Sequence, residues 1–208
     1  MKKAVYVYVF NTLADWEIGY LNAEIHSGRY FRKDREPLRI ITMGNSRKPV
    51  ETMGGLKIVP DIVINEFNLN DAAALILPGG NTWTDQIHDG VLALAKTCLD
   101  TDIIVAAICG ATMGLARAGL LDQRYHTSNA LEVLMTVCLE YNGEQYYQNS
   151  PSVIDGNLIT ASGVAPIEFA ANALMKLDVF LPETLDAWKQ LYKTFEAKYF
   201  FELMRLTQ

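Results

Sequence analysis

Short runs of uninterrupted apolar residues recur along the chain, and each is typical of a strand buried on both faces of a sheet. The strongest runs are AVYVYVF at 4–10, AAALIL at 72–77 and IIVAAI at 103–108. Two weaker runs follow the same pattern, LRIITM at 38–43 and LKIVPD at 56–61. The pattern therefore predicts a sheet whose central strands are covered on both sides.

Between these runs, apolar residues recur at intervals of three and four, which is the spacing of one helix face. Gly28 is a suitable C-terminal stop for the first helix, and Pro166 fits the first turn of a later one. Ser128 or Asn129 is expected to cap the helix that follows it. The predicted helices span 14–28, 84–99, 110–118, 129–141 and 166–180, with a final amphipathic helix or helix pair over 183–206.

The turn Asp155-Gly156-Asn157 lies between two apolar segments and predicts a β-hairpin over 152–161. Elsewhere strands and helices alternate, which favours an α/β fold with a mostly parallel sheet and helices on both faces. The sequence contains no internal repeat, low-complexity segment or linker. We therefore expect one domain, with a core over about 3–181 and a helical extension over about 182–208.

Composition and charge narrow the possible partners. Half of the 208 residues are apolar, and an excess of acidic residues gives a formal net charge of −6. Such a chain lacks the positive patch that binds nucleic acid, and anionic membrane surfaces repel it. The apolar run near the N-terminus is too short for a signal peptide, and no run reaches the ~18–20 apolar residues of a membrane span. We expect a cytoplasmic protein.

Cys109 stands where an apolar strand runs directly into a helix, between Ala107 and Ala111. A sharp strand–nucleophile–helix turn needs small residues two positions before and after the nucleophile. The helix N-terminus would favour the thiolate form. A buried, inert cysteine is the alternative interpretation. Cys98 and Cys138 lie inside helical runs and are interpreted as packing residues, and three cysteines are too few for a disulfide scaffold.

Two other strand ends carry residues suited to a reaction site. Gly79-Gly80 follows the strand at 72–77, and the N–H groups of Gly80 and Gly110 are candidates for an oxyanion hole, although a plain turn would look the same. Glu17 lies near the start of the first helix. Placed beside a thiolate it would have a raised pKa and could donate a hydrogen bond to sulfur, whereas a solvent-facing glutamate is the simpler alternative.

Of the three histidines, His126 is the candidate general base, because it follows Cys109 by 17 residues in a loop that can return to the strand end. His26 and His88 lie on helical stretches and are expected to be exposed. No histidine pair has metal-ligand spacing, and no Cys-x-x-Cys, dinucleotide fingerprint or P-loop occurs. We therefore expect neither a metal nor a cofactor.

Five motifs occur in this order along the chain: Glu17, LPGG at 77–80, AAICGA at 106–111, His126 and ITASG-x-x-P-x-E-F at 159–169. Together they resemble the ThiJ/PfpI superfamily, whose class I glutamine-amidotransferase-like domain is a flavodoxin-like three-layer sandwich. The resemblance covers roughly 3–181 and implies that Cys109 is the nucleophile, hydrogen-bonded by Glu17, with Gly80 and Gly110 as backbone donors and His126 near the thiol. It also implies a homodimer.

Two departures from the superfamily pattern restrict the activities that the resemblance implies. Peptidase-like members have a histidine directly after the cysteine, where this chain has Gly110. Glutaminases of the wider fold class use a His-x-Glu pair, and Pro166-Ile167-Glu168 keeps only the glutamate. Glutamine amidotransferase activity is therefore not expected.

Three functions remain open from the sequence. The first is an enzyme in which Cys109 attacks a small reactive carbonyl, as in a glyoxalase or deglycase, or an amide or peptide bond, as in a hydrolase. The second is a redox-sensing or stress-protective protein that oxidises at Cys109 without turnover. The third concerns assembly, because the apolar stripe over 185–203 suits either the protein's own core or a dimer interface.

Overall fold

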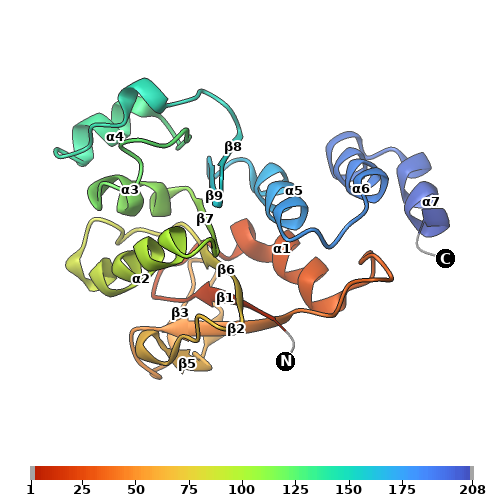
Figure 1. The fold of residues 1–208 in the computed structure, drawn as a ribbon, viewed down its shortest axis with the longest axis horizontal. Coiled ribbons are helices and arrows are strands. Elements are labelled where there is room, and N and C mark those ends of the chain that lie inside the picture. The colour runs from red at the N-terminus through yellow and green to blue at the C-terminus, as the bar shows by residue number, and fades with distance from the viewer. Residues whose placement is uncertain (1–2, 207–208) are drawn as a thin grey trace.

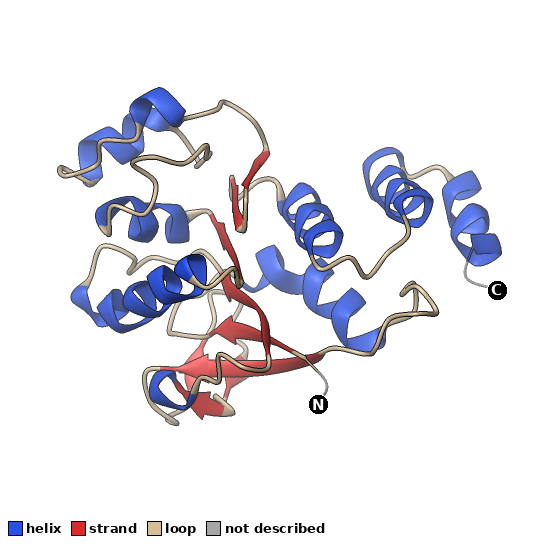
Figure 2. Ribbon diagram, in the orientation of Figure 1, coloured by secondary structure: helices blue, strands red, loops and turns tan. Residues whose placement is uncertain are grey.

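A mostly parallel sheet forms the centre of the molecule (Figures 1 and 2). The computed structural model describes residues 3–206, and within that range seven strands pair in the order β5-β2-β1-β6-β7-β9-β8. Neighbouring strands run parallel except β8 and β9, which form the antiparallel hairpin expected at 152–161. The strands are β1 Ala4–Tyr8, β2 Arg39–Gly44, β5 Ile62–Val63, β6 Ala72–Leu77, β7 Ile104–Ile108, β8 Ser152–Asp155 and β9 Leu158–Ala161.

Helices cover both faces of this sheet, which confirms the flavodoxin-like sandwich (Figure 1). Helices α1 and α5 pack together on one side, and α2 and α3 lie on the other. Beyond α5, α6 and α7 add a further pair. The helices are α1 Asp15–Ser27, α2 Asp89–Asp100, α3 Gly110–Arg117, α4 Leu131–Val137, α5 Pro166–Lys176, α6 Pro182–Thr194 and α7 Ala197–Leu206, with short 3-10 turns at Ile64–Glu66, Gln86–His88 and Glu144–Tyr146.

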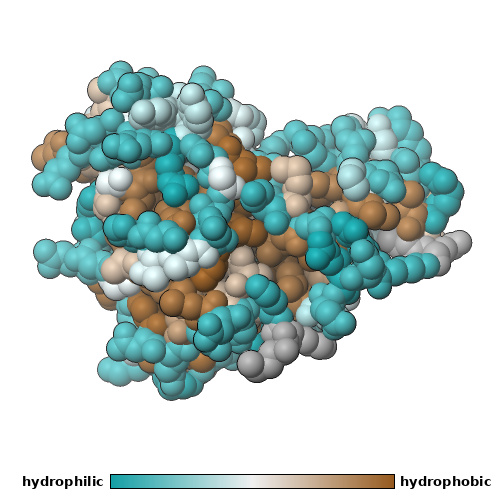
Figure 3. Space-filling model, in the orientation of Figure 1, coloured by the Kyte–Doolittle hydropathy of each residue, from teal (hydrophilic) through white to brown (hydrophobic). Residues whose placement is uncertain are grey.

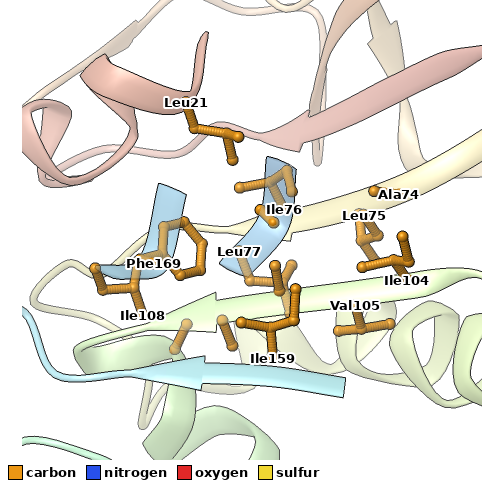
Figure 4. Packing of buried hydrophobic residues seen from close by; sticks show 14 of the residues in the cluster. Leu21, Ala74, Leu75, Ile76, Leu77, Ile104, Val105, Ile108, Ile159 and Phe169 are labelled. Carbon is orange, nitrogen blue, oxygen red and sulfur yellow. The ribbon is translucent and has the colours of Figure 1, made fainter. Parts of the chain in front are cut away.

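The core is built on the three apolar runs that the sequence pattern singled out. Every residue of β1 and β7 is buried, and β6 is buried except for one partly exposed alanine. Figure 4 shows Leu21 of α1 and Phe169 of α5 lying against side chains of the central strands, including Leu77 and Ile108. Because parallel strands buried on both faces need no polar alternation, the continuous apolar runs identify them.

The segment between β2 and β6 differs from the single strand predicted over 56–61. Val50–Glu51 (β3) and Lys57–Ile58 (β4) form a separate antiparallel pair, and Ile62–Val63 (β5) joins the edge of the main sheet. Pro60 lies between β4 and β5 and cannot donate a ladder hydrogen bond, so it divides the run.

Helices α4 and α5 are among those that are shorter than predicted. Helix α4 begins at Leu131, after an extended Ala130, so neither Ser128 nor Asn129 caps it. Helix α5 ends at Lys176, and Asp178 then adopts a left-handed conformation with φ 52°. In that conformation Asp178 forms an ion pair with Arg32 at 2.8 Å. The pair holds the segment that follows α5 against the loop after α1.

The C-terminal segment is a helix pair, as one form of the prediction allowed. Helix α6 ends where Phe195 takes a left-handed φ of 60°, and α7 turns back beside it. The fully buried Trp188 donates its indole N–H to Glu24 Oε1 on α1 at 2.9 Å, and Arg29 pairs with the same carboxylate. This buried carboxylate therefore ties the extension to the core.

Figure 3 shows hydrophilic side chains over much of the visible surface, with apolar ones reaching it between them. Among residues 3–206, none of the helices has the length and apolar character needed to cross a bilayer.

Candidate active site

Cys109 occupies a strained turn between β7 and α3, the strand–turn–helix geometry expected from the sequence. Its backbone has φ 58° and ψ −125°, a conformation that costs a non-glycine residue about 1–3 kcal/mol. Two interactions hold it there: the Cys109 N–H donates to Ala161 O at 2.9 Å, and the Thr112 hydroxyl donates to Cys109 O at 2.6 Å. The turn directs Sγ to the carboxyl end of the sheet.

Two glycines let neighbouring backbone approach the cysteine closely. A Cβ on Gly79 would lie 2.6 Å from Cys109 Cβ, and a Cβ on Gly163 would lie 2.7 Å from Sγ. Such distances are too short for real contacts, so neither position accepts a side chain unless the site moves.

Glu17 is fully buried and faces the same place, so it is not a solvent-facing glutamate. The Gly79 N–H donates to its Oε2 at 2.7 Å. Oε1 has no hydrogen-bond partner among the described protein atoms, and it borders the thiol, because the Cβ position on Gly163 lies 3.1 Å from Oε1 as well as near Sγ. Burial raises the pKa of the Glu17 carboxyl, and its contacts with Gly79 and Cys109 only partly oppose that rise. The carboxyl therefore holds a proton more readily than an exposed glutamate does.

The thiol of Cys109 does not show the simple thiolate preference expected from the helix end. Burial raises its pKa and the Glu17 charge raises it further, whereas hydrogen bonds from Asn129 and the Gly110 amide lower it. Partial burial disfavours the charged thiolate by more than the helix N-terminus stabilises it. Cysteine and carboxyl together therefore form a pair in which both groups favour the protonated form.

Asn129 is a site residue that the sequence analysis considered only as a helix cap. Its amide nitrogen donates to Cys109 Sγ at 3.3 Å, and its Oδ1 accepts from the Gly163 N–H at 2.8 Å. The second bond fixes the orientation of the amide, so that the NH₂ group faces the sulfur. No local pattern marks this role, since it depends on the return of residues 162–163 to the strand end.

His126 is buried, and both of its ring nitrogens bond elsewhere. Nδ1 lies 2.7 Å from Arg124 O, which can only accept, so Nδ1 carries the hydrogen. Nε2 lies 2.7 Å from the Tyr141 hydroxyl. Burial lowers the pKa of the ring, which favours this neutral form. No hydrogen bond joins His126 to Cys109 within the described chain.

His88 is fully buried, so the prediction that it is exposed was wrong. Its ring stacks on Trp83 with 4.5 Å between centroids and shares hydrogen bonds with Tyr8 and Thr82. His26 is exposed, as expected. The interpretation of Cys98 and Cys138 as packing residues is confirmed, because both are buried.

The backbone of Gly80 and Gly110 meets beside the cysteine. A Cβ on Gly110 would lie 2.8 Å from Gly80 O and 3.5 Å from Gly80 N. The Gly110 amide interacts with Sγ, and the Gly80 N–H has no acceptor among the described protein atoms. The Gly80 N–H is therefore free to bind an oxygen atom formed next to the sulfur, and the Gly110 N–H already faces that place. Among the residues placed by the structure, no group of three His, Cys, Asp or Glu side chains is arranged to hold a metal ion.

Comparison with known proteins agrees with this fold and chemistry. The sequence profile described as the DJ-1/PfpI family matches residues 3–176. The chain belongs to the DJ-1/PfpI family. Its structure is similar to the crystal structure of the thiJ/pfpI family protein from Bacillus anthracis, with 51% identity, a TM-score of 0.95 and coverage of 99% of this chain and 97% of that one. The resemblance inferred from the motifs is confirmed.

The names of related family members point to two activities. A Bacillus subtilis protein named uncharacterized protease YoaZ is 50% identical over 202 residues, which cover 97% of this chain and 96% of that protein. The glutathione-independent glyoxalase DJR-1.2 of Caenorhabditis elegans is 26% identical over 146 residues, which cover 69% of this chain and 76% of that protein. Family membership alone does not show whether this chain has either of these activities.

Proposed function

We propose that this DJ-1/PfpI protein is a cysteine-dependent enzyme acting on small reactive carbonyl compounds, with Cys109 as nucleophile and Glu17 as proton carrier. The observation that carries the proposal is the strained cysteine held against a buried carboxyl whose pKa is raised. A carboxyl with a raised pKa holds a proton more readily than an exposed glutamate and can still release it, which general acid–base catalysis requires.

For an α-oxoaldehyde such as methylglyoxal, Sγ adds to the aldehyde carbon while the ionised form of Glu17 takes the thiol proton. The Gly80 and Gly110 N–H groups stabilise the oxygen that becomes negatively charged. Glu17 protonates this oxygen and then removes the proton from C1, which gives an enediolate. It returns that proton to C2, and the hydroxyl proton on the C1 oxygen passes to the C2 oxygen, which leaves a thioester. Water breaks the thioester bond, releasing a 2-hydroxy acid and the free thiol. Neither an oxidant nor a metal ion is consumed.

Peptide or amide hydrolysis is the less well supported form of the same chemistry. Its leaving amine must be protonated, a task that imidazole performs in Cys–His enzymes. The ring of His126 is already bonded to Arg124 and Tyr141, and Gly110 stands where a histidine would follow the cysteine. The name of the Bacillus subtilis relative nevertheless makes peptides the appropriate comparison substrate.

The test measures lactate formed from methylglyoxal by the wild-type protein and by Cys109→Ala, with a mixture of unmodified peptides as the second substrate. We expect lactate from the wild type and none above background from the variant. Equal lactate from both proteins would eliminate the proposal, and peptide cleavage without lactate would replace it with the hydrolase form.

A second candidate function is redox sensing or stress protection by oxidation of Cys109 without turnover. The favouring observation is that Cys109 is partly exposed, whereas Cys98 and Cys138 are buried. The Asn129 amide and the Gly110 N–H would stabilise a sulfinate by charge-assisted hydrogen bonds. Peptide mass mapping after mild peroxide tests it: oxygen is expected first at Cys109, and earlier oxidation of either buried cysteine would exclude this function.

A further inference from the structure

A surface pocket of about 320 Å³ adjoins the cysteine site and has Asn129 in its wall. Three separate segments line it, at 128–129, 149–151 and 162–168. Its volume falls at the lower end of the range of small-molecule sites, roughly 300–1,000 Å³. It therefore has room for a group much larger than methylglyoxal.

The pocket and the sulfur share one wall. Asn129 contacts Sγ through its amide nitrogen at 3.3 Å. Gly163, whose Cβ position lies 2.7 Å from Sγ, stands between the pocket residues Ser162 and Val164. A ligand that fills the pocket would consequently reach the immediate neighbourhood of the nucleophile.

Glu168 gives this pocket its electrostatic character, since it is the single ionisable residue in the lining. Its side chain is 21% exposed and forms an ion pair with Lys193 of α6 at 2.5 Å. Lys193 is not part of the lining and is itself 40% exposed. The pair lies at the surface and is only partly buried, so a cation on a ligand can take the place of the lysine.

Apolar, amide and hydroxyl groups complete the lining. Val164 is 92% exposed, and it borders the pocket together with Pro151. Asn149 contributes an exposed carboxamide that can bond a peptide group. An aliphatic stem ending in a positive charge matches this combination, because the stem can cover apolar surface while the charge meets the carboxylate.

We propose that this pocket binds substrates bearing a Lys- or Arg-like side chain, with Glu168 as the residue that selects their positive charge. The cation replaces Lys193 at Glu168, and the carbonyl group of the same molecule lies next to Cys109. The inference rests on the proposed function for the reaction that follows, but the selection of charge does not require turnover.

The test compares rates at which Cys109 is modified by three methanethiosulfonates that differ in charge: cationic trimethylammonium-ethyl, anionic sulfonatoethyl and neutral methyl. In each case Sγ forms a disulfide with the reagent's sulfenyl sulfur, and methanesulfinate leaves. Peptide mapping assigns the modification to Cys109. We expect Glu168→Gln to lower the cation-to-anion rate ratio about threefold, the size of one screened charge interaction across the pocket.

Two further variants make this result specific. Lys193→Met frees Glu168 and is expected to raise the ratio. Glu183→Gln removes an equal charge from the exposed first turn of the same helix α6 and is expected to leave the ratio unchanged. An unchanged ratio in Glu168→Gln, or an equal fall in Glu183→Gln, would overturn the proposal. If the wild-type protein forms no lactate but Glu168→Gln still lowers the cation-to-anion ratio, only the proposed function is overturned.

Discussion

At the scale of single residues, the site concentrates unfavourable conformations and unfavourable burial in a few positions. Cys109 has a positive φ, and Glu17 is a buried carboxyl with one oxygen that lacks a hydrogen-bond partner. Both features lower stability, and under the proposed function both give the pair its reactivity, which is the usual compromise at functional sites. The predictions at this scale therefore concern stability as well as activity.

Glu17→Gln is expected to stabilise the protein at neutral pH. The folded-state pKa of Glu17 is raised, so the wild type loses stability as pH rises above the unfolded value near 4.5, where the buried group would have to ionise. Glutamine keeps an oxygen for the Gly79 N–H and never ionises. Urea unfolding at several pH values should show a difference that grows from acid to neutral pH; a difference independent of pH would contradict this explanation.

Gly163→Ala is expected to impair the site without unfolding the protein. The added methyl group would lie 2.7 Å from Sγ, and a shift of about 1 Å in reacting groups can cost about 10²-fold in rate. Alkylation of Cys109 by iodoacetamide and lactate formation should both fall. The control is Gly19→Ala on α1, where a Cβ meets nothing within 4 Å. Equal effects of the two substitutions would show that the close approach of Gly163 to Sγ does not matter for the reactivity of Cys109.

At this scale the sequence predicts those site residues whose role depends on their neighbours in the chain. Cys109 and the glycines around it are recognisable because a strand, a sharp turn and a helix are consecutive in the chain. Asn129 is not recognisable, because its bond to Sγ requires residues 162–163 to return to the same strand end. The burial of His126 and His88 is likewise set by distant partners, Tyr141 for one and Tyr8 for the other.

At the scale of elements, the central strands follow directly from their apolar runs, whereas the edge segments do not. The two-residue strands β3, β4 and β5 have too few residues to show a period, and pairing alone defines them. The C-terminal helix pair has a clear amphipathic pattern, but its attachment to α1 depends on one buried carboxylate, Glu24, that no periodicity reveals.

Trp188→Phe is expected to weaken this attachment. The substitution removes the indole N–H from the buried Glu24 carboxylate and leaves unfilled volume, so we expect a loss of about 1–3 kcal/mol in the free energy of unfolding. Trp16→Phe is the matched control, because Trp16 is 50% exposed and its replacement should change stability by less than about 0.5 kcal/mol. Similar urea midpoints for the two variants would contradict the role assigned to Glu24.

At the scale of the whole molecule, the chain order brings four distant segments to one edge of the sheet. Glu17 comes from the start of α1, Gly79 and Gly80 follow β6, Cys109 follows β7, and Gly163 follows β9. Reaction sites of open α/β sheets form at this edge, outside the carboxyl ends of the strands. The fold therefore assembles the site, while the loops between 128 and 168 form the adjoining pocket.

We expect the protein to be a homodimer that uses the C-terminal helices. Phe195 is 85% exposed and Phe201 64% exposed, and exposed aromatic clusters are typical of interfaces. Light scattering should give twice the chain mass of 23.2 kDa. Replacing both phenylalanines by serine should shift the mass toward the monomer. A monomeric mass for the wild type would refute this prediction.

The central claim is that a buried carboxyl, and not an imidazole, moves the proton at Cys109. The most direct test is the rate of lactate formation from methylglyoxal by Glu17→Gln and by Tyr141→Phe, which removes the hydroxyl from His126 Nε2, with folding of both variants verified by urea unfolding. We predict that Glu17→Gln loses about 10²–10⁴-fold in kcat, the usual value of a positioned acid–base group, while Tyr141→Phe stays within a few-fold of the wild type. A full rate in Glu17→Gln together with a collapsed rate in Tyr141→Phe would contradict the account.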